Sequence, residues 1–131
     1  MWIYKGEEYN EPGDNYGFVY IITNLTNDRK YIGKKFFWTT KRKTVNKKKR
    51  KVKVESDWKK YWSSSAELIK DIEELGENSF KREIIHLCKS KGVTNYLEAK
   101  EQFLRTVLED NEKWYNGIIN VRVNKTHIRL L

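Results

Sequence analysis

Two tyrosines, Tyr20 and Tyr31, lie eleven residues apart on either side of the polar stretch "TNLTND". A phenol can accept or donate a proton during a reaction, but its ordinary pKa of about 10 makes it a poor base at neutral pH. A nearby cation would favour the phenolate, and Lys35, four residues after Tyr31, is our candidate for that cation. Phenols of this kind could serve acid–base chemistry supported by a positive charge, but an aromatic pair across a hairpin is also an ordinary sheet stabiliser.

The residues around these tyrosines predict a β-hairpin. Aromatic and β-branched residues precede the polar stretch, and "KYIG" resumes an extended pattern after it. A turn centred on residues 27–28 gives opposed residues an index sum of 55. Because opposed residues of an antiparallel pair share a face, Tyr20, Tyr31, Gly33 and Lys35 should all project from one side of the sheet. Gly33 would leave an open space there, into which a phosphate could enter.

A carboxylate is expected within the apolar stripe of a late helix that runs from Asn95 to about Asp110. The inward series is Leu97, Glu101, Leu104 and Leu108, and the polar face consists of Glu98, Gln102, Arg105 and Glu109. Burying an unpaired carboxylate costs on the order of several kcal/mol, so Glu101 should be balanced by Lys, Arg or a metal ion. A structural ion pair is thus the alternative to a metal site.

Three further elements should surround the hairpin. "FFWTT" and "KVKVE" are typical of two strands that form a second hairpin or flap. Ser64 and Glu67 form a capping box for a helix that Gly76 closes. Residues 80–88, "FKREIIHLC", predict a third core strand, and residues 1–16 predict an arm with only loose structure.

Positive charge is concentrated in one segment. Residues 34–60 contain 13 Lys or Arg and two acids, whereas the rest of the chain contains 14 Lys or Arg and 16 acids. Phe36, Phe37, Trp38 and Trp58 lie in the same segment, so cations that neutralise phosphates alternate with rings that can stack. A solvated basic loop is the alternative. We expect nucleic acid to be contacted by Lys34, Lys41, Lys43, Lys47, Lys48, Lys49, Arg50 and Lys51.

Length and composition exclude several classes of protein. The 131 residues suit one domain. No apolar run approaches membrane-spanning length, and the N-terminus is too polar for a signal peptide, so we expect a soluble intracellular protein without a membrane partner. A single cysteine, Cys88, excludes an internal disulfide, and two histidines are too few for a zinc site of the usual spacing. A catalytic metal would therefore need oxygen ligands.

Together these features resemble the GIY-YIG nuclease family, which includes homing endonucleases, some restriction enzymes and a repair nuclease subunit. The first signature corresponds to "FVY" ending at Tyr20 and the second to "YIG" beginning at Tyr31. Further matches are the passage "SSSAELIKDIEELGENSF", Glu101, and "WYN" ending at Asn116. The resemblance implies an α+β fold, a small three-stranded antiparallel sheet flanked by helices. The chain would then divide into an arm (1–16) and one nuclease domain (17–131) with a basic insertion at about 36–56.

The function that the resemblance implies is metal-dependent hydrolysis of DNA phosphodiesters. Glu101 would hold one Mg²⁺ or Mn²⁺, which polarises the scissile phosphate. Tyr20 would accept the proton of the attacking water, and Tyr31 would orient that water or the phosphate. Asn116 would support the site by fixing the end of the chain or orienting a phosphate; a simple turn role is the alternative.

The family usually presents an arginine from a helix about two turns after its second signature, and this sequence has an extended basic segment there. Arg42 lies nine residues after Gly33 and approximates the spacing, so we predict that it stabilises negative charge in the transition state. Arg50 competes for this role, and Lys35 could carry part of it. Alternatively, both arginines only bind the DNA backbone.

Two other functions stay open. A nucleic-acid-binding protein would keep the basic segment but pair Glu101 with Lys or Arg, and an inhibitor module would keep the fold without cleaving. Compact members of the family resemble the freestanding endonucleases of bacteriophages, so analogy suggests a phage protein that acts in the host-cell cytoplasm. DNA specificity, nicking versus double-strand cleavage, and monomer versus homodimer are not determined by the sequence.

Overall fold

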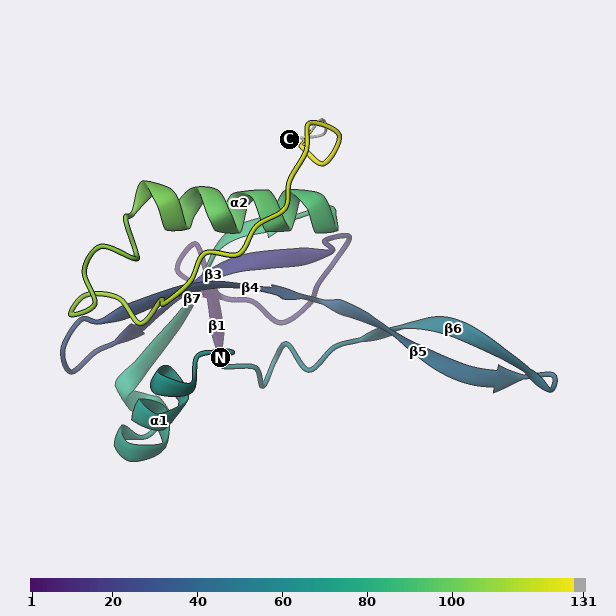
Figure 1. Ribbon diagram of the computed structural model, residues 1–131. Helices are drawn as coiled ribbons and strands as arrows, with labels where there is room; N and C mark the ends of the chain where they lie inside the picture. Colours follow the sequence, from purple (N-terminus) through teal and green to yellow (C-terminus); the bar gives the residue numbers. More distant parts are fainter. Residues whose placement is uncertain (129–131) are drawn as a thin grey trace.

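Three apolar segments form the middle of the sheet. β3 (Gly17–Asn24) is buried along its whole length and lies between β4 (Lys30–Phe36) and β7 (Phe80–Cys88), antiparallel to both. The structure, a computed structural model, describes residues 1–128 except for the side chain of Val45. The expected hairpin and the expected third strand are both confirmed. A central strand buried on both faces requires a covering layer on each side of the sheet, and Figure 1 shows these layers.

The sheet is larger than the three strands expected, because the N-terminal arm joins it. β1 (Trp2–Tyr4) pairs parallel with β7, and β2 (Glu7–Glu8) pairs with β1, which gives a mixed sheet in the order β2-β1-β7-β3-β4. Trp2 is only 2% exposed, and its indole Nε1 donates a hydrogen bond to the carbonyl of Trp58 at 2.7 Å. Burial of this large ring explains why the arm is ordered rather than loose.

Helices cover the sheet on both sides. α1 (Ala66–Leu75) lies below the sheet and α2 (Lys91–Leu104) lies above it in Figure 1; a short 3₁₀ turn (Glu77–Ser79) links α1 to β7. The cap of α1 is Ser65, whose side chain accepts from the backbone N–H of Leu68, rather than the expected Ser64. Neither helix is long and apolar enough to cross a lipid bilayer, as far as residues 1–128 are concerned.

The late helix differs from its expected bounds and face. α2 begins at Lys91 with Ser90 as its cap, four residues before the expected start, and ends at Leu104 rather than at about Asp110. The buried side chains are those of Val93, Thr94, Ala99 and Gln102. Leu104 is exposed, and Leu108 lies beyond the helix and is exposed as well. The expected inward stripe is therefore wrong at Leu104 and Leu108, whereas Leu97 packs against the core as expected. Gln102, expected on the polar face, is buried.

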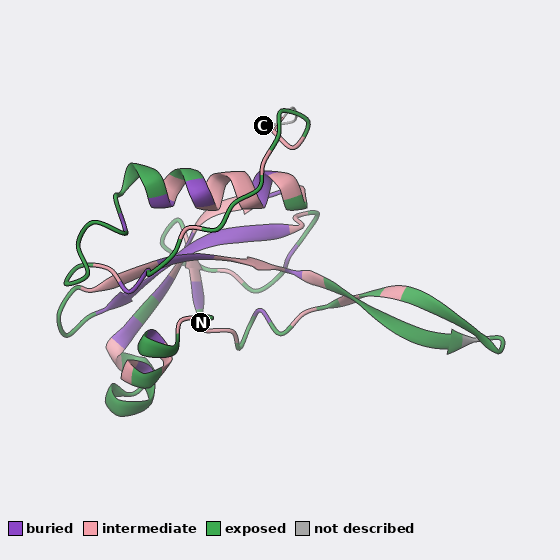
Figure 2. Ribbon diagram, in the orientation of Figure 1, coloured by how far each residue is buried: buried purple, intermediate pink, exposed green. Residues whose placement is uncertain are grey.

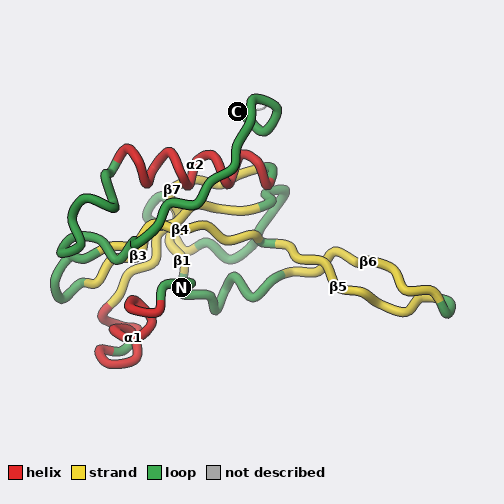
Figure 3. The backbone as a smooth tube through the Cα atoms, viewed as in Figure 1, coloured by secondary structure: helices red, strands yellow, loops and turns green. Residues whose placement is uncertain are grey.

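The basic insertion forms a separate two-stranded antiparallel ribbon, as expected for a flap. β5 (Trp38–Val45) and β6 (Lys48–Glu55) are joined by Asn46 and Lys47, both with positive φ, as in the tight hairpin turns that match strand twist. The ribbon extends away from the five-stranded sheet (Figures 1 and 3) and its outer part is exposed (Figure 2). Phe37 and Trp58, both 0% exposed, flank its base and pack together in the core with ring centroids 4.9 Å apart.

Candidate active site

The two signature tyrosines lie side by side on the lower face of the sheet, the face that α1 covers. Tyr20 opposes Gly33 and Ile22 opposes Tyr31, so the index sum is 53 rather than the expected 55. The sum is still odd, and the prediction that Tyr20, Tyr31 and Gly33 share a face is confirmed. The ring centroids of the two tyrosines are 6.2 Å apart at an interplanar angle of 37°.

The space beside Gly33 on this face of the sheet is filled by tyrosine side chains rather than open. A Cβ atom at Gly33 would lie 2.4 Å from the Tyr20 Oη atom and 2.8 Å from Cε1 of Tyr31. Glycine is therefore required so that the Tyr20 phenol can cross over the neighbouring strand. The expectation of a gap for a phosphate is corrected: the phenol itself occupies that gap.

The chain that follows the ribbon covers Tyr20. The ring of Tyr61 lies edge-on to that of Tyr20, with centroids 6.2 Å apart at 80°, and the hydroxyls of Tyr31 and Ser64 are 3.3 Å apart. Tyr20 is only 1% exposed, whereas Tyr31 and Tyr61 are partly exposed. We call Tyr20, Tyr31 and Tyr61 the tyrosine cluster. Sequence reasoning missed Tyr61, which no signature marks.

Burial makes Tyr20 a weak acid. Desolvation raises its pKa well above 10, and the neighbouring phenols of Tyr61 and Tyr31 raise it further, against a hydrogen bond from Ser63 that lowers it. The pKa of Tyr61 is raised as well, again mainly by burial. Tyr20 is therefore a neutral phenol at physiological pH, able to donate and accept hydrogen bonds.

Lys35 brings positive charge to this cluster. Its Nζ atom lies 4.2 Å from the centroid of the Tyr61 ring and 2.7 Å from Oδ1 of Asp57. The hydrogen bond from Lys35 lowers the pKa of the Asp57 carboxyl. Since Asp57 is largely exposed, this ion pair can exchange for a contact with an anionic ligand at small cost.

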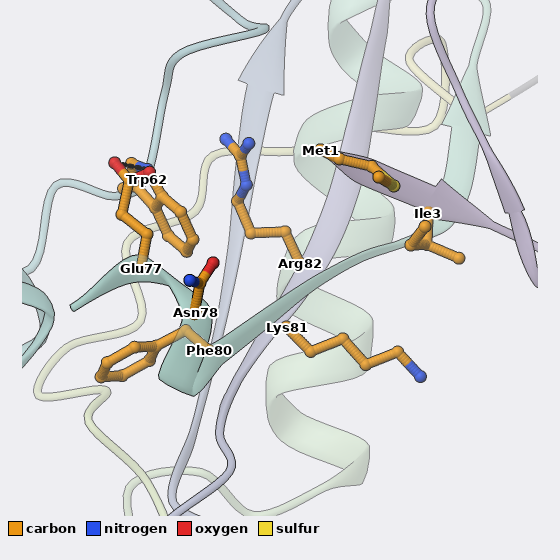
Figure 4. Close-up of a pocket in the computed structure, with 8 residues that line it drawn as sticks. All are labelled: Met1, Ile3, Trp62, Glu77, Asn78, Phe80, Lys81 and Arg82. Atoms are coloured by element: carbon orange, nitrogen blue, oxygen red, sulfur yellow. Dashed lines mark hydrogen bonds between the residues drawn. The ribbon is translucent and has the colours of Figure 1, made fainter. Parts of the chain in front are cut away.

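Arg82 holds the covering segment in place. It is 5% exposed, its Nη1 atom donates to the carbonyls of Tyr61 (2.7 Å) and Lys59 (3.3 Å), and its guanidinium lies between the rings of Trp2 and Trp62. Figure 4 shows Arg82 and Trp62 at the pocket beside this segment. In β7, Arg82 lies between Phe80 and Ile84 on the buried side of the strand. A charged residue at such an inward position is the sequence signal by which Arg82 could have been recognised.

Glu101 lies on the other face of the sheet. Its Oε1 atom is 2.9 Å from Nε2 of His86, and its Oε2 atom accepts from Nε of Arg105 at 2.9 Å. His86 opposes Val19, which belongs to the apolar layer between the sheet and α2, whereas the adjacent Tyr20 belongs to the opposite layer. The structure therefore does not bring Glu101 to the tyrosine cluster. Partial burial raises the pKa of its carboxyl, but hydrogen bonds from His86 and Arg105 outweigh this and lower it below the ordinary value.

This arrangement does not fit a metal ion shared with the tyrosines. Both carboxylate oxygens of Glu101 already face cationic or hydrogen-bonding partners. Within residues 1–128, no three His, Cys, Asp or Glu side chains are grouped closely enough to hold a metal. We therefore assign no catalytic step to a metal bound at Glu101.

A second carboxylate of α2, that of Glu98, faces the edge strand β4. Glu98, expected on the surface, is close to Lys34, with Nζ and Oε1 3.6 Å apart, and desolvation raises the pKa of its carboxyl despite that cation. Lys34 also donates to Oδ1 of Asn95 at 2.5 Å. Its predicted DNA contact is thus opposed by two internal partners.

Asn116 fastens the chain after α2 to the edge strand. Its side chain accepts from the backbone N–H of Ile32 at 3.1 Å and donates to the carbonyl of the same residue at 2.8 Å, and Gln102 donates to that carbonyl as well. The amide thus imitates a neighbouring strand at the centre of the second signature. Asn116 therefore acts as a positioning residue, because it holds in place the strand that carries Tyr31 and Gly33.

The predicted arginine lies away from the tyrosine cluster. Arg42 is in the middle of β5, exposed, and opposite Lys51 of β6. Arg50 opposes Lys43 on the same ribbon. The predicted DNA contacts at Lys41, Lys43, Lys47, Lys48, Lys49, Arg50 and Lys51 are likewise all exposed on the ribbon.

Comparison with known proteins identifies the family. A family model described as "Putative endonuclease segE, GIY-YIG domain" matches residues 2–119. No curated protein and no solved structure matches the chain. The match covers most of the chain, including the N-terminal strand, both signatures, the ribbon and Asn116. The chain therefore belongs to the GIY-YIG nuclease family.

Proposed function

We propose that the protein is a DNA endonuclease that hydrolyses phosphodiester bonds at the tyrosine cluster. The family is described as an endonuclease domain, and a nuclease takes nucleic acid as its substrate. The observation that carries the proposal is the meeting of both signature tyrosines with a third phenol and a lysine: Tyr20, Tyr31 and Tyr61 adjoin one another, and Lys35 lies over the Tyr61 ring.

The phosphate first meets Tyr31 and Lys35 in this proposal. The Tyr31 hydroxyl has an exposed serine as its partner, and Lys35 can exchange Asp57 for a phosphate oxygen. In hydrolysis, water forms a new bond to phosphorus, the bond to the departing sugar oxygen breaks, and that oxygen takes up a proton. A lysine beside the phosphate stabilises the negative charge that develops there.

Tyr20 acts as a hydrogen-bonding relay in this scheme. Its raised pKa opposes a stable phenolate, so it accepts the proton of the attacking water only while its own proton passes to the adjacent Tyr61. Tyr61, which is partly exposed, releases its own proton to solvent in the same relay. Direct contact between DNA and Tyr20 would require the segment with Tyr61 and Ser63 to move. The dependence on Mg²⁺ or Mn²⁺ stays a prediction, and metal binding by Glu101 would require its contacts with His86 and Arg105 to open.

Plasmid cleavage tests this proposal. Wild type is compared with Tyr31→Phe, Tyr20→Phe and Lys35→Gln, in Mg²⁺, in Mn²⁺ and in EDTA, and nicked and linear products are quantified separately. We expect Tyr31→Phe and Tyr20→Phe to lower the rate by about 10²- to 10⁴-fold. Tyr96→Phe, which changes a phenol on α2, is the matched control and should cleave like wild type. Equal rates for Tyr31→Phe and Tyr96→Phe would contradict the proposed site.

A second candidate is a nucleic-acid-binding module that does not cleave. Two observations favour it: Tyr20 is sealed from solvent, and the carboxylate of Glu101 is bonded to His86 and Arg105. The same assay separates the two functions. A wild-type protein that binds duplex DNA but leaves plasmid intact in both metals would support the binding module.

A further inference from the structure

We propose that the β5–β6 ribbon enters the major groove of duplex DNA and contacts phosphates on both sides of that groove, rather than lying flat against the backbone. The ribbon comprises residues 38–55. The inference rests on the proposed function only for the choice of DNA, and it goes beyond that function by giving the mode of binding.

Both faces of the ribbon are cationic. Residues 39–54 contain nine Lys or Arg and no acid, and all nine are exposed. From the register, one face carries Arg42, Lys49, Lys51 and Lys53, and the opposite face carries Lys41, Lys43, Lys48 and Arg50, with Lys47 in the turn. Within residues 1–128, none of these cations forms an ion pair. A ribbon that docks with one face needs charge on one face only.

Like charges also oppose one another across the ribbon. Arg42 lies opposite Lys51, and Lys43 lies opposite Arg50, one such pair on each face. Directly opposed like charges destabilise a strand pair, and an isolated two-stranded hairpin is only marginally stable in water. An anionic surface on each side of the ribbon would relieve both repulsions, and the two strands of a DNA groove supply two such surfaces.

The dimensions select the major groove. Eight residues per strand at about 3.3 Å each give a ribbon roughly 26 Å long, and the strands are about 4.8 Å apart. The major groove of B-DNA, about 12 Å wide, admits a two-stranded ribbon, whereas the minor groove, about 6 Å wide, does not. The major groove of A-form RNA is deep and narrow, so duplex RNA should bind less well.

The base of the ribbon links this DNA-binding element to the tyrosine cluster. Phe37 and Trp58 lock the two ends of the insertion into the core, and the Ser56 hydroxyl donates to the carbonyl of Phe36 at 2.6 Å. Lys35 and Asp57 lie next to these anchors in the chain and pair with each other. DNA held along the ribbon is therefore directed towards Lys35.

Two double variants on the same strand test groove insertion. Lys49→Gln with Lys51→Gln neutralises one face, and Lys48→Gln with Arg50→Gln neutralises the other. Binding to a fluorescent duplex is measured in EDTA, with the DNA checked for integrity, over a series of salt concentrations. Each phosphate contact contributes about 0.9 to the slope of log K against log salt, so each variant should reduce the slope by about 1 to 2. Thermal melting verifies that both variants are folded.

These measurements distinguish failure of groove insertion from failure of the proposed nuclease function. Equal losses of slope in both variants support insertion, and a loss in only one variant overturns it in favour of flat binding. Bulky groups at the pyrimidine 5-position, which fill the major groove, should weaken binding at least tenfold, whereas a minor-groove ligand should not compete. Wild-type slopes in both variants would overturn the inference while plasmid cleavage could still establish the nuclease. Losses in both variants without any cleavage would leave the inference standing and refute the nuclease.

Discussion

Substitution of Gly33 by alanine probes the closest contact in the tyrosine cluster. The added methyl carbon would lie 2.4 Å from Oη and 2.6 Å from Cζ of Tyr20, and 2.8 Å from Cε1 of Tyr31. Atoms in ordinary contact are about 3.5 Å apart, so the phenol would have to move by roughly 1 Å. The Tyr20 ring cannot move freely, since the rings of Trp2, Phe18 and Tyr61 are packed around it.

The structure therefore predicts losses of both stability and activity for Gly33→Ala. Overpacking of this kind costs about 1–3 kcal/mol of unfolding free energy, which corresponds to a melting temperature lower by roughly 3–10 °C for a chain of this size. A displacement of about 1 Å at a reacting group can lower the rate about 10²-fold. Melting is followed by circular dichroism, and cleavage by plasmid nicking.

Two further variants sharpen the experiment. Gly117→Ala is the matched control, since its Cβ would meet nothing within 4 Å, and it should melt and cleave like wild type. Adding Tyr20→Phe to Gly33→Ala removes the atom in the shortest contact, so the double variant should lose less stability than the sum of the single losses. The reasoning is refuted if Gly33→Ala matches Gly117→Ala in both assays.

Three other predictions follow from the charged and buried groups. Arg82→Lys removes the Nη1 atom that donates to two carbonyls, and we expect it to lower the free energy of unfolding by about 2–3 kcal/mol and to alter the tryptophan fluorescence. Unchanged melting would contradict the anchoring role. The pKa of Glu101 is lowered in the folded state, so its stabilising contribution is present above about pH 4.5 and is lost as the pH falls through the folded value. In denaturant titrations, Glu101→Gln should therefore reduce the fall in the free energy of unfolding at acid pH. A loss of cleavage of 10³-fold or more in this variant would instead support a metal at Glu101. The pKa of Tyr20 is raised in the folded state, so its contribution to folding stability is present below about pH 10 and falls as the pH rises further. In an ultraviolet titration, Tyr20→Phe should remove the phenol that ionises last. Removal of a phenol that ionises early would refute the burial of Tyr20.

Local pattern was sufficient for the hairpin and the ribbon. Because Tyr20 and Tyr31 are an odd number of residues apart, any odd index sum places them on one face, and a register error of two residues leaves every side chain on its predicted face. The ribbon is equally local, because its strands, its turn and its charges are contiguous in the chain. The resemblance to the family also rested on short motifs, and the family match agrees with it.

The placement of Glu101 depended on two features that the pattern did not reveal. The register between β3 and β7 shifts at Val19 and Tyr20, which directs His86 to the α2 side. α2 begins after its cap Ser90, upstream of the segment from which its stripe was inferred, and it ends before Leu108. Helical periodicity fixes which residues share a stripe, but the face of the sheet on which a helix packs is a property of the whole chain.

The sequence by itself determined the hairpin that pairs the tyrosines, the glycine between them and the concentration of positive charge, because each depends on residues close together in the chain. Only the tertiary structure decided that Tyr20 is buried beneath Tyr61, that Trp2 adds a strand to the sheet, and that Glu101 faces His86 and Arg105. Except for the Glu101–Arg105 pair, which lies within one helical stretch, these outcomes depend on contacts between residues 15 to 80 positions apart. The burial and pairing of such residues are settled only when all the layers of the fold pack together.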